Sequence, residues 1–420
     1  MKKILFILTG LLLTVIFLPA QEPFTISLDT CYQLAEKNYP LIRQYGLIEK
    51  TRLYTIDNAS KGFLPQLNFG GQASYQSDVT TFPTVPGLKF PVFYKDQYKI
   101  YAEVDQLIYD GGSIKNQKEA AQLDAEIRQQ SLQVNLYALR ARINQVYFGI
   151  LLLDEQISQI ELQKGDIQNG IDKAKAALAN GTAFRSYVDE LRAEWLKADR
   201  GTIEFRSSRK AWLEILSLFI HRPLGDKTAL IRPPAAARSE TIHRPELLLF
   251  DYQKKSADLQ DQIINTSFRP RFNLFLQGGY SRPGLDFLNP DFAWYYIGGI
   301  KFNWSLGTLY SRNNQRRLAE LQRNNLDIEK ETFLFNTQVD LQKQRAEVVK
   351  YEALMKADDE IIALRTAVKK ASLAQLENGV ATAHDYLAQV NSENQAKQEL
   401  ILHQVQWLLA QYNYQNVSGN

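Results

Sequence analysis

The feature that most constrains this chain is an internal repeat, in which one structural unit is written twice. The first matches share an offset of 205 residues, and they pair Pro40 with Pro245, Pro65 with Pro270, Asn68 with Asn273 and Tyr75 with Tyr280. Later matches share an offset of 198 residues, and they pair Tyr98 with Tyr296, Ser113 with Ser311, Asn116-Gln117 with Asn314-Gln315, and Asn180-Gly181 with Asn378-Gly379. The offset changes in a loop that contains proline and glycine, where a change in length is tolerated. We therefore predict two tandem structural repeats, residues 21–239 and 240–420.

Each repeat contains two segments in which hydrophobic residues recur at every second position. These predicted strands lie near 64–78 and 95–109 in the first repeat, and near 268–282 and 293–306 in the second. In the first segment, residues such as Leu67 and Phe69 alternate with polar residues or glycine, so one face of the strand is apolar. Strands of about 9 to 11 residues with this pattern and aromatic ends have the size that crosses an outer membrane. A solvated antiparallel sheet packed on one side would show the same alternation.

Most of the remaining sequence follows a heptad pattern typical of helices that pack along their length. Between Leu136 and Leu178 the seam positions step by three and four residues, and only Lys164 interrupts the apolar series. We predict uninterrupted helices over 113–179 and 308–377, each ~100 Å long at the rise of an α-helix, and shorter helices over 40–62, 183–221, 245–267 and 382–416. The two long helical hairpins then span 113–221 and 308–416, and a connecting segment spans 222–239. This pattern indicates a mainly α-helical coiled-coil architecture with added β-strands.

The first twenty residues have the three parts of a secretory signal. Two lysines precede an apolar run from Ile4 to Phe17, and Ala20 precedes the expected cleavage site. We predict a cleaved signal peptide over residues 1–20 and an exported mature protein. The alternative is an uncleaved membrane anchor, although the apolar run is short for a membrane span.

Composition argues against several other classes of function. The formal net charge is +3 and falls to +1 without the first twenty residues, and basic residues alternate with acidic ones, which argues against nucleic-acid binding. The single cysteine, Cys31, excludes an internal disulfide and a cysteine-based zinc site, and we predict that it is a buried helix residue. The four histidines are too scattered for a metal cluster, and no nucleophile stands beside a base. We predict neither an enzyme nor a protein that holds a metal ion or a cofactor.

The four predicted strands cannot close a membrane-spanning sheet within one chain. Two sheet edges would keep unsatisfied backbone groups, which the hydrocarbon core of a membrane does not tolerate. Barrels made by a single chain use at least about eight strands. A membrane-spanning sheet in this protein therefore requires several chains that together close one barrel.

Several motifs occur in order at the ends of the predicted helices and strands. They are Phe63-Leu64-Pro65-Gln66-Leu67 at a helix-to-strand junction, Leu107-Ile108-Tyr109-Asp110-Gly111-Gly112-Ser113 at a strand-to-helix junction, and Asn180-Gly181-Thr182-Ala183 and Asn378-Gly379-Val380-Ala381 at two hairpin tips. Taken together and at this spacing, the motifs resemble those of the TolC-like outer membrane factors. The resemblance covers essentially the whole chain after the signal peptide.

This resemblance implies a homotrimer, in which each chain gives four transmembrane β-strands to one barrel in the outer membrane. It also implies an α-helical barrel in the periplasm, with a belt near residues 222–239 and the two chain termini. The tips of such channels meet a periplasmic adaptor (membrane fusion) protein that is fixed to an inner-membrane transporter. The implied function is a passive exit duct of a tripartite efflux or type I secretion system, for small molecules or proteins. A secreted structural coiled coil that bridges envelope layers is the alternative function, and the four strands would serve no purpose in it.

The helix–strand junctions are the first group of residues that we single out. Pro65 and Pro270 stand where a helix stops and a strand begins, and proline suits that place because it has no N–H to donate. Asp110, Gly111 and Gly112 allow the turn from strand to helix, since glycine accepts a positive φ. The second repeat has Thr308-Leu309-Tyr310 at the matching place, so the two junctions are expected to differ in shape.

The hairpin tips are the second group. Glycine after asparagine ends each long helix, as at a helix C-terminus, and the tips are our candidates for adaptor contact because a partner must dock at the narrow end of a tube. The candidate residues are Asn180, Gly181, Arg185, Asn378, Gly379 and His384. Plain helix caps, with Arg185 and His384 as solvated surface residues, are the alternative.

The third group consists of two acidic residues just beyond the tips. The resemblance implies acidic rings at the closed aperture, and Asp385 matches one such position while Ala388 does not match the other. Leu376 and Ala381 replace the Tyr and Arg of the family's closing network. We hypothesise that three copies of Asp385, with Asp189, narrow the pore and attract cations. A carboxylate that only stabilises the start of a helix is the alternative.

Overall fold

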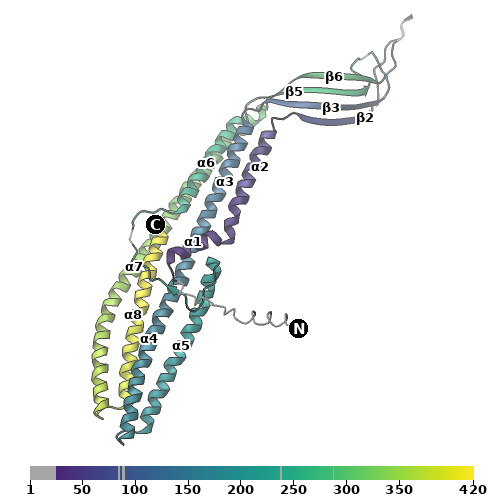
Figure 1. Cartoon of the computed structure of the whole chain (residues 1–420). Coiled ribbons are helices and arrows are strands. Elements are labelled where there is room, and N and C mark those ends of the chain that lie inside the picture. Colours follow the sequence, from purple (N-terminus) through teal and green to yellow (C-terminus); the bar gives the residue numbers. More distant parts are fainter. Residues whose placement is uncertain (1–24, 84–85, 88–89, 237–238, 287) are drawn as a thin grey trace, which may run out of the picture. The chain divides into compact units, whose positions relative to one another are not determined.

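The computed structural model describes residues 25–83, 86–87, 90–236, 239–286 and 288–420. The predicted signal peptide lies outside the described residues. The described chain divides into two compact units, and each draws on both halves of the sequence. The hairpin unit comprises the described residues up to Pro40, with Leu136–Ile242 and Val339–Asn420, and the sheet unit comprises Leu41–Asn135 and His243–Gln338. Figure 1 labels the helices of both units and the four strands of the sheet unit.

The sheet unit contains four antiparallel strands in the order β2-β3-β5-β6, which Figure 1 shows side by side. Their bounds are Gln66–Tyr75 for β2, Asp96–Tyr109 for β3, Arg271–Arg282 for β5 and Ala293–Asn303 for β6. The remaining elements of the unit are a 3-10 turn at Pro40–Arg43, α2 (Gln44–Lys61), α3 (Ser113–Tyr137), α6 (Pro245–Thr266), a 3-10 turn at Leu306–Thr308 and the first part of α7 (Leu309–Glu377). The four predicted strands are thus confirmed, and their observed ends lie within a few residues of the predicted ones.

The strand register places apolar side chains together on one face of the sheet. Phe69 stands opposite Ala102, Ala102 opposite Gly278, and Gly278 opposite Tyr296, so a single cross-strand row carries the alternation through the whole sheet. The large apolar side chains of this face are exposed in the single chain, and they include Leu67, Phe69, Ile100, Leu274, Leu276, Trp294, Tyr296, Ile300 and Phe302. The exposed fraction reaches 81% at Trp294 and at Tyr296. A face of this kind is stable only when something apolar covers it.

The opposite face contains a row in which glycine and tyrosine alternate across all four strands. The row consists of Gly70, Tyr101, Gly279 and Tyr295, each opposite the next. A Cβ atom on Gly70 would lie 2.6 Å from the Tyr101 ring, and a Cβ atom on Gly279 would lie 2.5 Å from the carbonyl oxygen of Ile100. The two glycines therefore let the tyrosine rings lie against the sheet, and no larger residue fits at Gly279 without a shift of the backbone.

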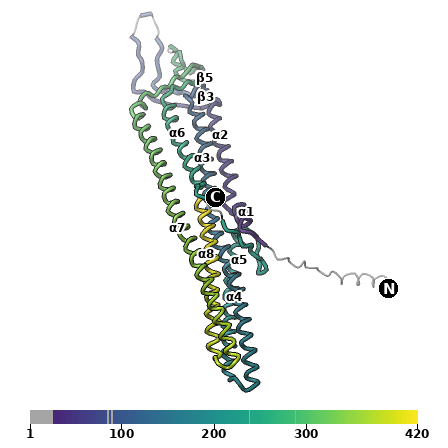
Figure 2. The backbone as a smooth tube through the Cα atoms, turned by 90° about the vertical axis from the view of Figure 1, so that its left-hand side faces the viewer, coloured from purple at the N-terminus to yellow at the C-terminus, as the bar shows by residue number. Residues whose placement is uncertain are grey.

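The hairpin unit contains a helical layer in which α4 (Leu139–Ala179) packs against α5 (Arg185–Ile220) and α8 (Ala383–Ser418), as Figure 2 also shows. The unit further includes β1 (Thr25–Ile26), α1 (Leu28–Asn38), β4 (Ala229–Leu230) and the last part of α7. The predicted seam is confirmed, because nine of its positions are buried: Leu136, Leu139, Ile143, Val146, Ile150, Ile160, Ile167, Ile171 and Ala174. Leu191 of α5 is buried in the same layer. Side chains at this spacing stabilise helices along their whole length.

The prediction of an uninterrupted helix over 113–179 is wrong at one residue. The structure separates α3 from α4 at Ala138, which has φ −61° and ψ −19°. The three-four spacing of apolar residues continues across this point, so the sequence pattern gives no sign of the break. The break falls where the chain passes from the sheet unit to the hairpin unit. The helix predicted over 308–377 is confirmed as the 69-residue helix α7.

Strand β1, at the start of the described chain, is hydrogen-bonded to the segment that follows α5. The strands β1 and β4 pair in parallel, with Thr25 opposite Ala229. The Tyr147 hydroxyl of α4 lies 2.9 Å from the Ile26 carbonyl oxygen and 2.7 Å from that of Ile231, so one buried side chain bonds both segments. Cys31 is fully buried in α1, as predicted, and burial raises the pKa of its thiol to about 12.

We expect the substitution Gly279→Ala to lower the stability of the sheet, because the added methyl group collides with the backbone of β3. The expected cost is about 1–3 kcal/mol, the usual range for overpacking. The measurement is the thermal unfolding midpoint in detergent. Gly278→Ala is the matched control, since its Cβ atom would meet its nearest neighbour only at 3.9 Å. Equal midpoints for the two variants would contradict the steric account.

Candidate functional site

Both hairpin tips close with the same backbone hydrogen bonds. Gly181 has φ +73° and Gly379 has φ +70°, which is the left-handed region that favours glycine. At the first tip, the Thr182 N–H donates to the Ala177 carbonyl at 2.9 Å, and the Gly181 N–H donates to the Leu178 carbonyl at 3.0 Å. This pair of bonds is the Schellman motif, which satisfies the last carbonyls of a helix.

The second tip has the same pair of backbone hydrogen bonds. The Val380 N–H donates to the Gln375 carbonyl at 2.9 Å, and the Gly379 N–H donates to the Leu376 carbonyl at 3.1 Å. The predicted turns are confirmed at both tips. The tip residues Asn180, Gly181, Arg185, Asn378, Gly379 and His384 are all exposed, so their backbone and side chains are accessible to a partner.

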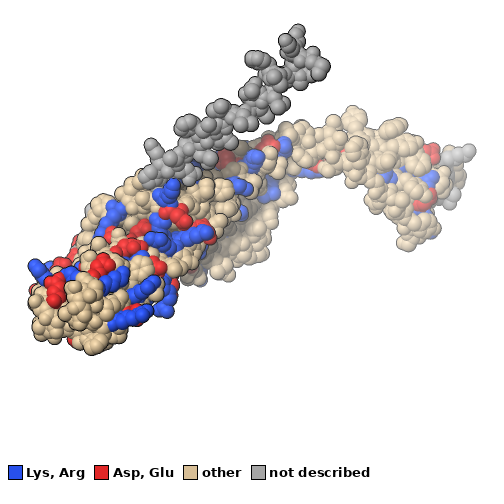
Figure 3. All heavy atoms as spheres, turned by 60° about the horizontal axis from the view of Figure 1, so that its bottom comes forward, with Lys and Arg blue, Asp and Glu red and all other residues tan. Residues whose placement is uncertain are grey.

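Two apolar side chains at the tips were not singled out from the sequence. Phe184 follows the first turn and is 73% exposed, and Val380 follows the second glycine and is 77% exposed. A hydrophobic residue within three positions after a tip glycine was the sequence signal for both. Figure 3 shows acidic and basic side chains interspersed around this end of the hairpin unit, with no large patch of one sign.

The ends of the two hairpins are joined to each other by polar contacts. Lys173 of α4 forms an ion pair with Glu377 of α7. His384 of α8 lies 2.9 Å from Glu190 of α5, measured from Nδ1 to Oε1. These contacts connect helices that lie about two hundred residues apart in the sequence. The predicted site residue His384 therefore has a partner within the chain.

Asp385 caps the start of α8. Its Oδ2 atom accepts a hydrogen bond from the Thr382 N–H at 2.9 Å and another from the Thr382 hydroxyl at 2.6 Å, while the Asp385 N–H donates to the Thr382 hydroxyl oxygen. This arrangement is a capping box. The hydroxyl bond, followed by the backbone bond, holds the pKa of this fully exposed carboxyl below its usual value. The cap explains the local position of Asp385, and its role at an aperture stays a hypothesis.

Asp189, the second aperture candidate, pairs with a residue on its own helix. Its Oδ2 atom lies 3.7 Å from the Nε atom of Arg185, one helical turn away in α5. Both side chains are largely exposed, so this pair adds little to stability. The Asp189 side chain is accessible to solvent.

A buried cluster of charged residues in the hairpin unit was missed from the sequence. Glu393 of α8 is 2% exposed, and it accepts bonds from Lys369 of α7 at 2.5 Å, Lys397 at 3.0 Å and the Thr366 hydroxyl at 2.7 Å. Lys369 also lies 2.7 Å from Asp166 of α4, so the cluster joins three helices. Glu393 follows Val390 by three residues, which is a spacing of the apolar seam. An acidic residue at a seam position was the sequence signal that could have indicated a buried charge.

The charges of this cluster support one another. Burial alone would raise the pKa of Glu393, but hydrogen bonds from Lys369, Thr366 and Lys397 hold it below the usual value. Burial likewise opposes the charge on Lys369, and the bonds to Asp166 and Glu393 raise its pKa. A buried carboxylate is tolerated here because it has three donors around it.

The helix–strand junctions also have the expected geometry. Pro65 and Pro270 each directly precede a strand, β2 and β5. Asp110 is buried, and its two carboxylate oxygens accept bonds from the Gly112 and Ile114 N–H groups at 2.8 Å and 2.5 Å. This carboxylate thereby caps the first turn of α3.

The glycines after Asp110 allow the two repeats to approach each other. Gly111 has φ +74° and Gly112 has φ +98°. A Cβ atom on Gly111 would lie 2.8 Å from the Cβ atom of Arg269, whose guanidinium donates to the Gly111 carbonyl at 3.2 Å. The second repeat uses a 3-10 turn over Leu306–Thr308 instead, so the prediction that the two junctions differ in shape is confirmed.

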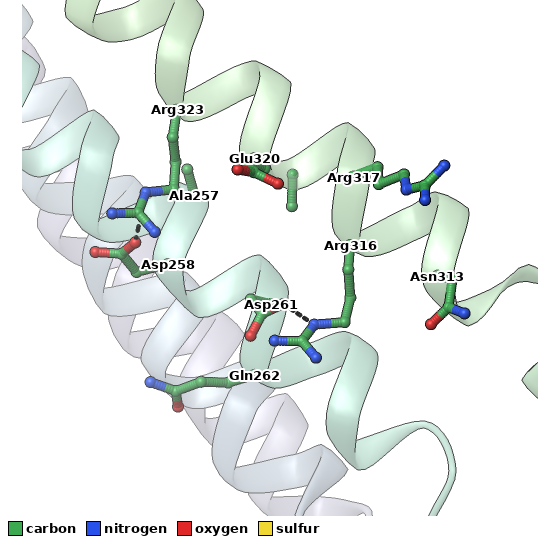
Figure 4. A pocket seen from close by; sticks show the side chains of 10 residues that line it. Ala257, Asp258, Asp261, Gln262, Asn313, Arg316, Arg317, Glu320 and Arg323 are labelled. Atoms are coloured by element: carbon green, nitrogen blue, oxygen red, sulfur yellow. Dashed lines mark hydrogen bonds and ion pairs between the residues drawn. The ribbon is translucent and has the colours of Figure 1, made fainter.

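A groove of about 640 Å³ lies between α6 and α7 in the sheet unit. Figure 4 shows Arg316 and Arg323 of α7 reaching across it to Asp261 and Asp258 of α6, at 3.0 Å and 3.2 Å. Arg317 points away from these pairs (Figure 4). Basic and acidic side chains balance in the groove lining, so it has the character of a helix–helix ion-pair ladder and not of an anion site.

Within the part of the chain that the structure describes, no group of three or more His, Cys, Asp or Glu side chains is placed to hold a metal ion. None of the described helices combines the length and the apolar character needed to cross a membrane.

Residues 31–218 match the family model described as outer membrane efflux protein. This stretch covers most of the first predicted repeat, and the resemblance to the TolC-like outer membrane factors is thereby confirmed. The prediction that the chain is not an enzyme agrees with this family match.

Solved structures of outer membrane proteins share this fold over nearly the whole chain. The match to VceC of Vibrio cholerae has 15% identity, covers 94% of this chain and 96% of that one, and has a TM-score of 0.59. The match to the CmeC outer membrane channel of Campylobacter jejuni has 12% identity, coverage of 93% and 85%, and a TM-score of 0.64. The match to the open MtrE outer membrane channel of Neisseria gonorrhoeae has 16% identity, coverage of 94% and 89%, and a TM-score of 0.63.

No curated protein sequence matches this chain. Because the identities to these solved structures are only 12–16%, the matches establish the fold and nothing more. The family match supports a role in efflux at the outer membrane.

We expect the substitution Lys369→Met to lower the stability of the hairpin unit by on the order of 2 kcal/mol at neutral pH, because it removes a cation from a buried carboxylate. In the wild type, the lowered pKa of Glu393 stabilises the fold above the unfolded-state pKa of about 4.3, and this contribution is lost as the pH falls through the folded-state pKa. The stability difference between wild type and variant should therefore narrow in acid. Thermal unfolding at neutral and acidic pH measures it.

Lys350→Met is the matched control, since Lys350 stands on the same helix, is itself exposed, pairs with Glu347 and lies over the ring of Tyr351. It should change stability by less than about 0.5 kcal/mol at either pH. A Lys369→Met variant as stable as this control would show that the buried cluster contributes nothing.

Proposed function

We propose that this chain is one subunit of a homotrimeric outer-membrane channel, which serves as the passive exit duct of a tripartite efflux or type I secretion system. The observation that carries the proposal is the four-stranded sheet with an apolar face and two open edges. Among the described residues, β2 pairs only with β3, and β6 pairs only with β5. In a lipid environment the free N–H and C=O groups of these edges need partners, and further copies of the same sheet supply them.

Aromatic residues at both ends of the apolar face support the membrane setting. At the end near the helices, Tyr109, Phe272 and Phe302 contact one another in series. At the far end, Tyr280 contacts Phe292 and Trp294. Two aromatic girdles that flank an apolar band are typical of strands that cross an outer membrane. The secreted bridging coiled coil, our alternative, gives no reason for such a face.

An exposed apolar stripe on α7 supports association with a second copy. Leu321, Ile328 and Phe335 recur every seven residues in the sheet unit, and each is at least 60% exposed. Heptad spacing brings these side chains to one face of the helix. A face of this kind buries its apolar area against another helix, and a neighbouring copy of the same chain offers one in a closed ring.

The hairpin tips are the proposed docking site for a periplasmic adaptor protein. The two tips share one backbone geometry, and each presents an exposed apolar side chain, Phe184 or Val380. Asn180, Gly181, Arg185, Asn378, Gly379 and His384 lie around these side chains and are our adaptor-contact candidates. An inner-membrane transporter held by the adaptor would deliver the cargo, and a signal peptide over residues 1–20 would direct the chain to the envelope.

Asp385 and Asp189 are the proposed aperture residues of the duct. Both stand just beyond a tip and both are exposed and charged, so three copies would place their carboxylates around the axis of the tube. We expect the purified wild-type protein to conduct ions in planar lipid bilayers. The Asp385→Asn, Asp189→Asn double variant should have a changed conductance and a weaker preference for cations, because neutral side chains attract fewer of them.

Single-channel recording with reversal potentials in a salt gradient measures both quantities. Glu347→Gln is the control, since Glu347 is a half-buried, paired residue of α7 that lies about thirty residues before the second tip. Unchanged conductance and unchanged cation preference in the double variant would rule out the aperture role. A wild-type protein that forms no conducting pore would contradict the duct itself and favour the bridging coiled coil.

A further inference from the structure

The face of the sheet opposite the apolar face carries charged side chains close together. By the strand register, its charged positions are Lys99, Glu103, Asp105, Arg271 and Lys301. If the apolar face contacts lipid, this polar face lines the lumen of the barrel. The inference below therefore rests on the proposed channel function.

Lys301 is the centre of a cluster that spans three strands. Its ammonium group on β6 forms ion pairs with Glu103 and with Asp105 of β3, the second at 3.3 Å. Gln277 of β5 lies between them and donates a hydrogen bond to Glu103 at 2.7 Å. Lys301 is 44% exposed, whereas Glu103 and Asp105 are 16% and 21% exposed. The lysine thus covers two carboxylates and presents its own charge to the solvent on this face.

Lys99, the other lysine of this face, contacts aromatic rings instead of carboxylates. The Lys99 ammonium lies over the rings of Tyr101 and Tyr295, at 4.9 Å and 5.5 Å from their centroids. These are the rings that lie against the sheet over Gly70 and Gly279. Lys99 is therefore a matched control for Lys301. It has the same charge on the same face of the sheet, but its ammonium group lies over aromatic rings and not beside carboxylates.

We propose that Lys301 is a selectivity-determining residue of the channel, which offsets one of the two negative charges that Glu103 and Asp105 place on the lumen wall. Without it, each chain would present two uncompensated carboxylates at neighbouring levels of the barrel. Rings of such carboxylates attract cations and repel anions. With Lys301 in place, each chain keeps only one uncompensated negative charge in this cluster, so this part of the duct repels anions less.

A purely structural role predicts a different result. Opposite charges on β6 and β3, which lie on either side of β5, can also stabilise the sheet, and loss of that stabilisation would lower the unfolding midpoint without changing ion preference. Reversal potentials separate the two roles, because they measure the relative permeability of cations and anions in channels that have assembled.

The experiment compares full-length wild type, Lys301→Gln and Lys99→Gln in planar bilayers, across a KCl gradient near 0.1 M, where the screening length is about 10 Å. Lys301→Gln should raise the permeability ratio of K⁺ to Cl⁻ by about twofold or more, since one unit charge acting at close range through water changes an equilibrium by roughly fivefold. Lys99→Gln should change this ratio less. The Glu103→Gln, Lys301→Gln double variant should return close to wild type, because it keeps the same net charge.

Three outcomes would overturn the inference: an unchanged ratio in Lys301→Gln, equal shifts in both lysine variants, or a double variant as cation-selective as Lys301→Gln. The wild-type recording tests the proposed function separately. A wild type that does not conduct contradicts the channel, whereas a conducting wild type with an unaltered Lys301→Gln contradicts only the role of Lys301.

Discussion

Backbone hydrogen bonding at the two edges of the four-stranded sheet is the constraint on which this structure depends. A sheet that exposes Phe69, Trp294 and Tyr296 on one face needs an apolar environment, and an apolar environment leaves no water to satisfy the edges of β2 and β6. Only pairing with another sheet meets both requirements. In the proposed closed assembly, the charged opposite face would line the lumen and the exposed heptad stripe of α7 would pack against a neighbouring copy.

Charged residues also occur at positions of the long apolar seams in the hairpin unit. Lys164 interrupts the seam of α4, and it lies 2.7 Å from Asp199 and close to the Trp195 ring. Glu393 interrupts the seam of α8 and is surrounded by Lys369, Lys397 and Thr366. Each of the two charges has a charged partner on a neighbouring helix, Asp199 of α5 for Lys164 and Lys369 of α7 for Glu393. These polar positions therefore also fix which helices pack together and in which register.

The sequence predicts local geometry well and contacts between distant segments poorly. Strand positions, the glycine turns and the proline junctions follow from the period of hydrophobicity and from backbone preferences, so they were predictable. The break at Ala138 was not, because the apolar spacing continues across it, and neither were the pairs His384–Glu190 and Lys369–Glu393, because they depend on which helices become neighbours. Asp385 illustrates both cases. Its capping box involves only neighbouring residues and is predictable from sequence, whereas a role at an aperture would depend on the assembly of several chains.

The most direct test of the central claim is the mass of the protein extracted from isolated outer membranes. Light scattering in detergent, with the detergent contribution subtracted, gives this mass without labels. We predict a particle of three chains, each of 48.1 kDa before removal of the signal peptide. A monomer or dimer recovered from the soluble envelope fraction without detergent would contradict the shared barrel, because the sheet edges would then have no partner in lipid.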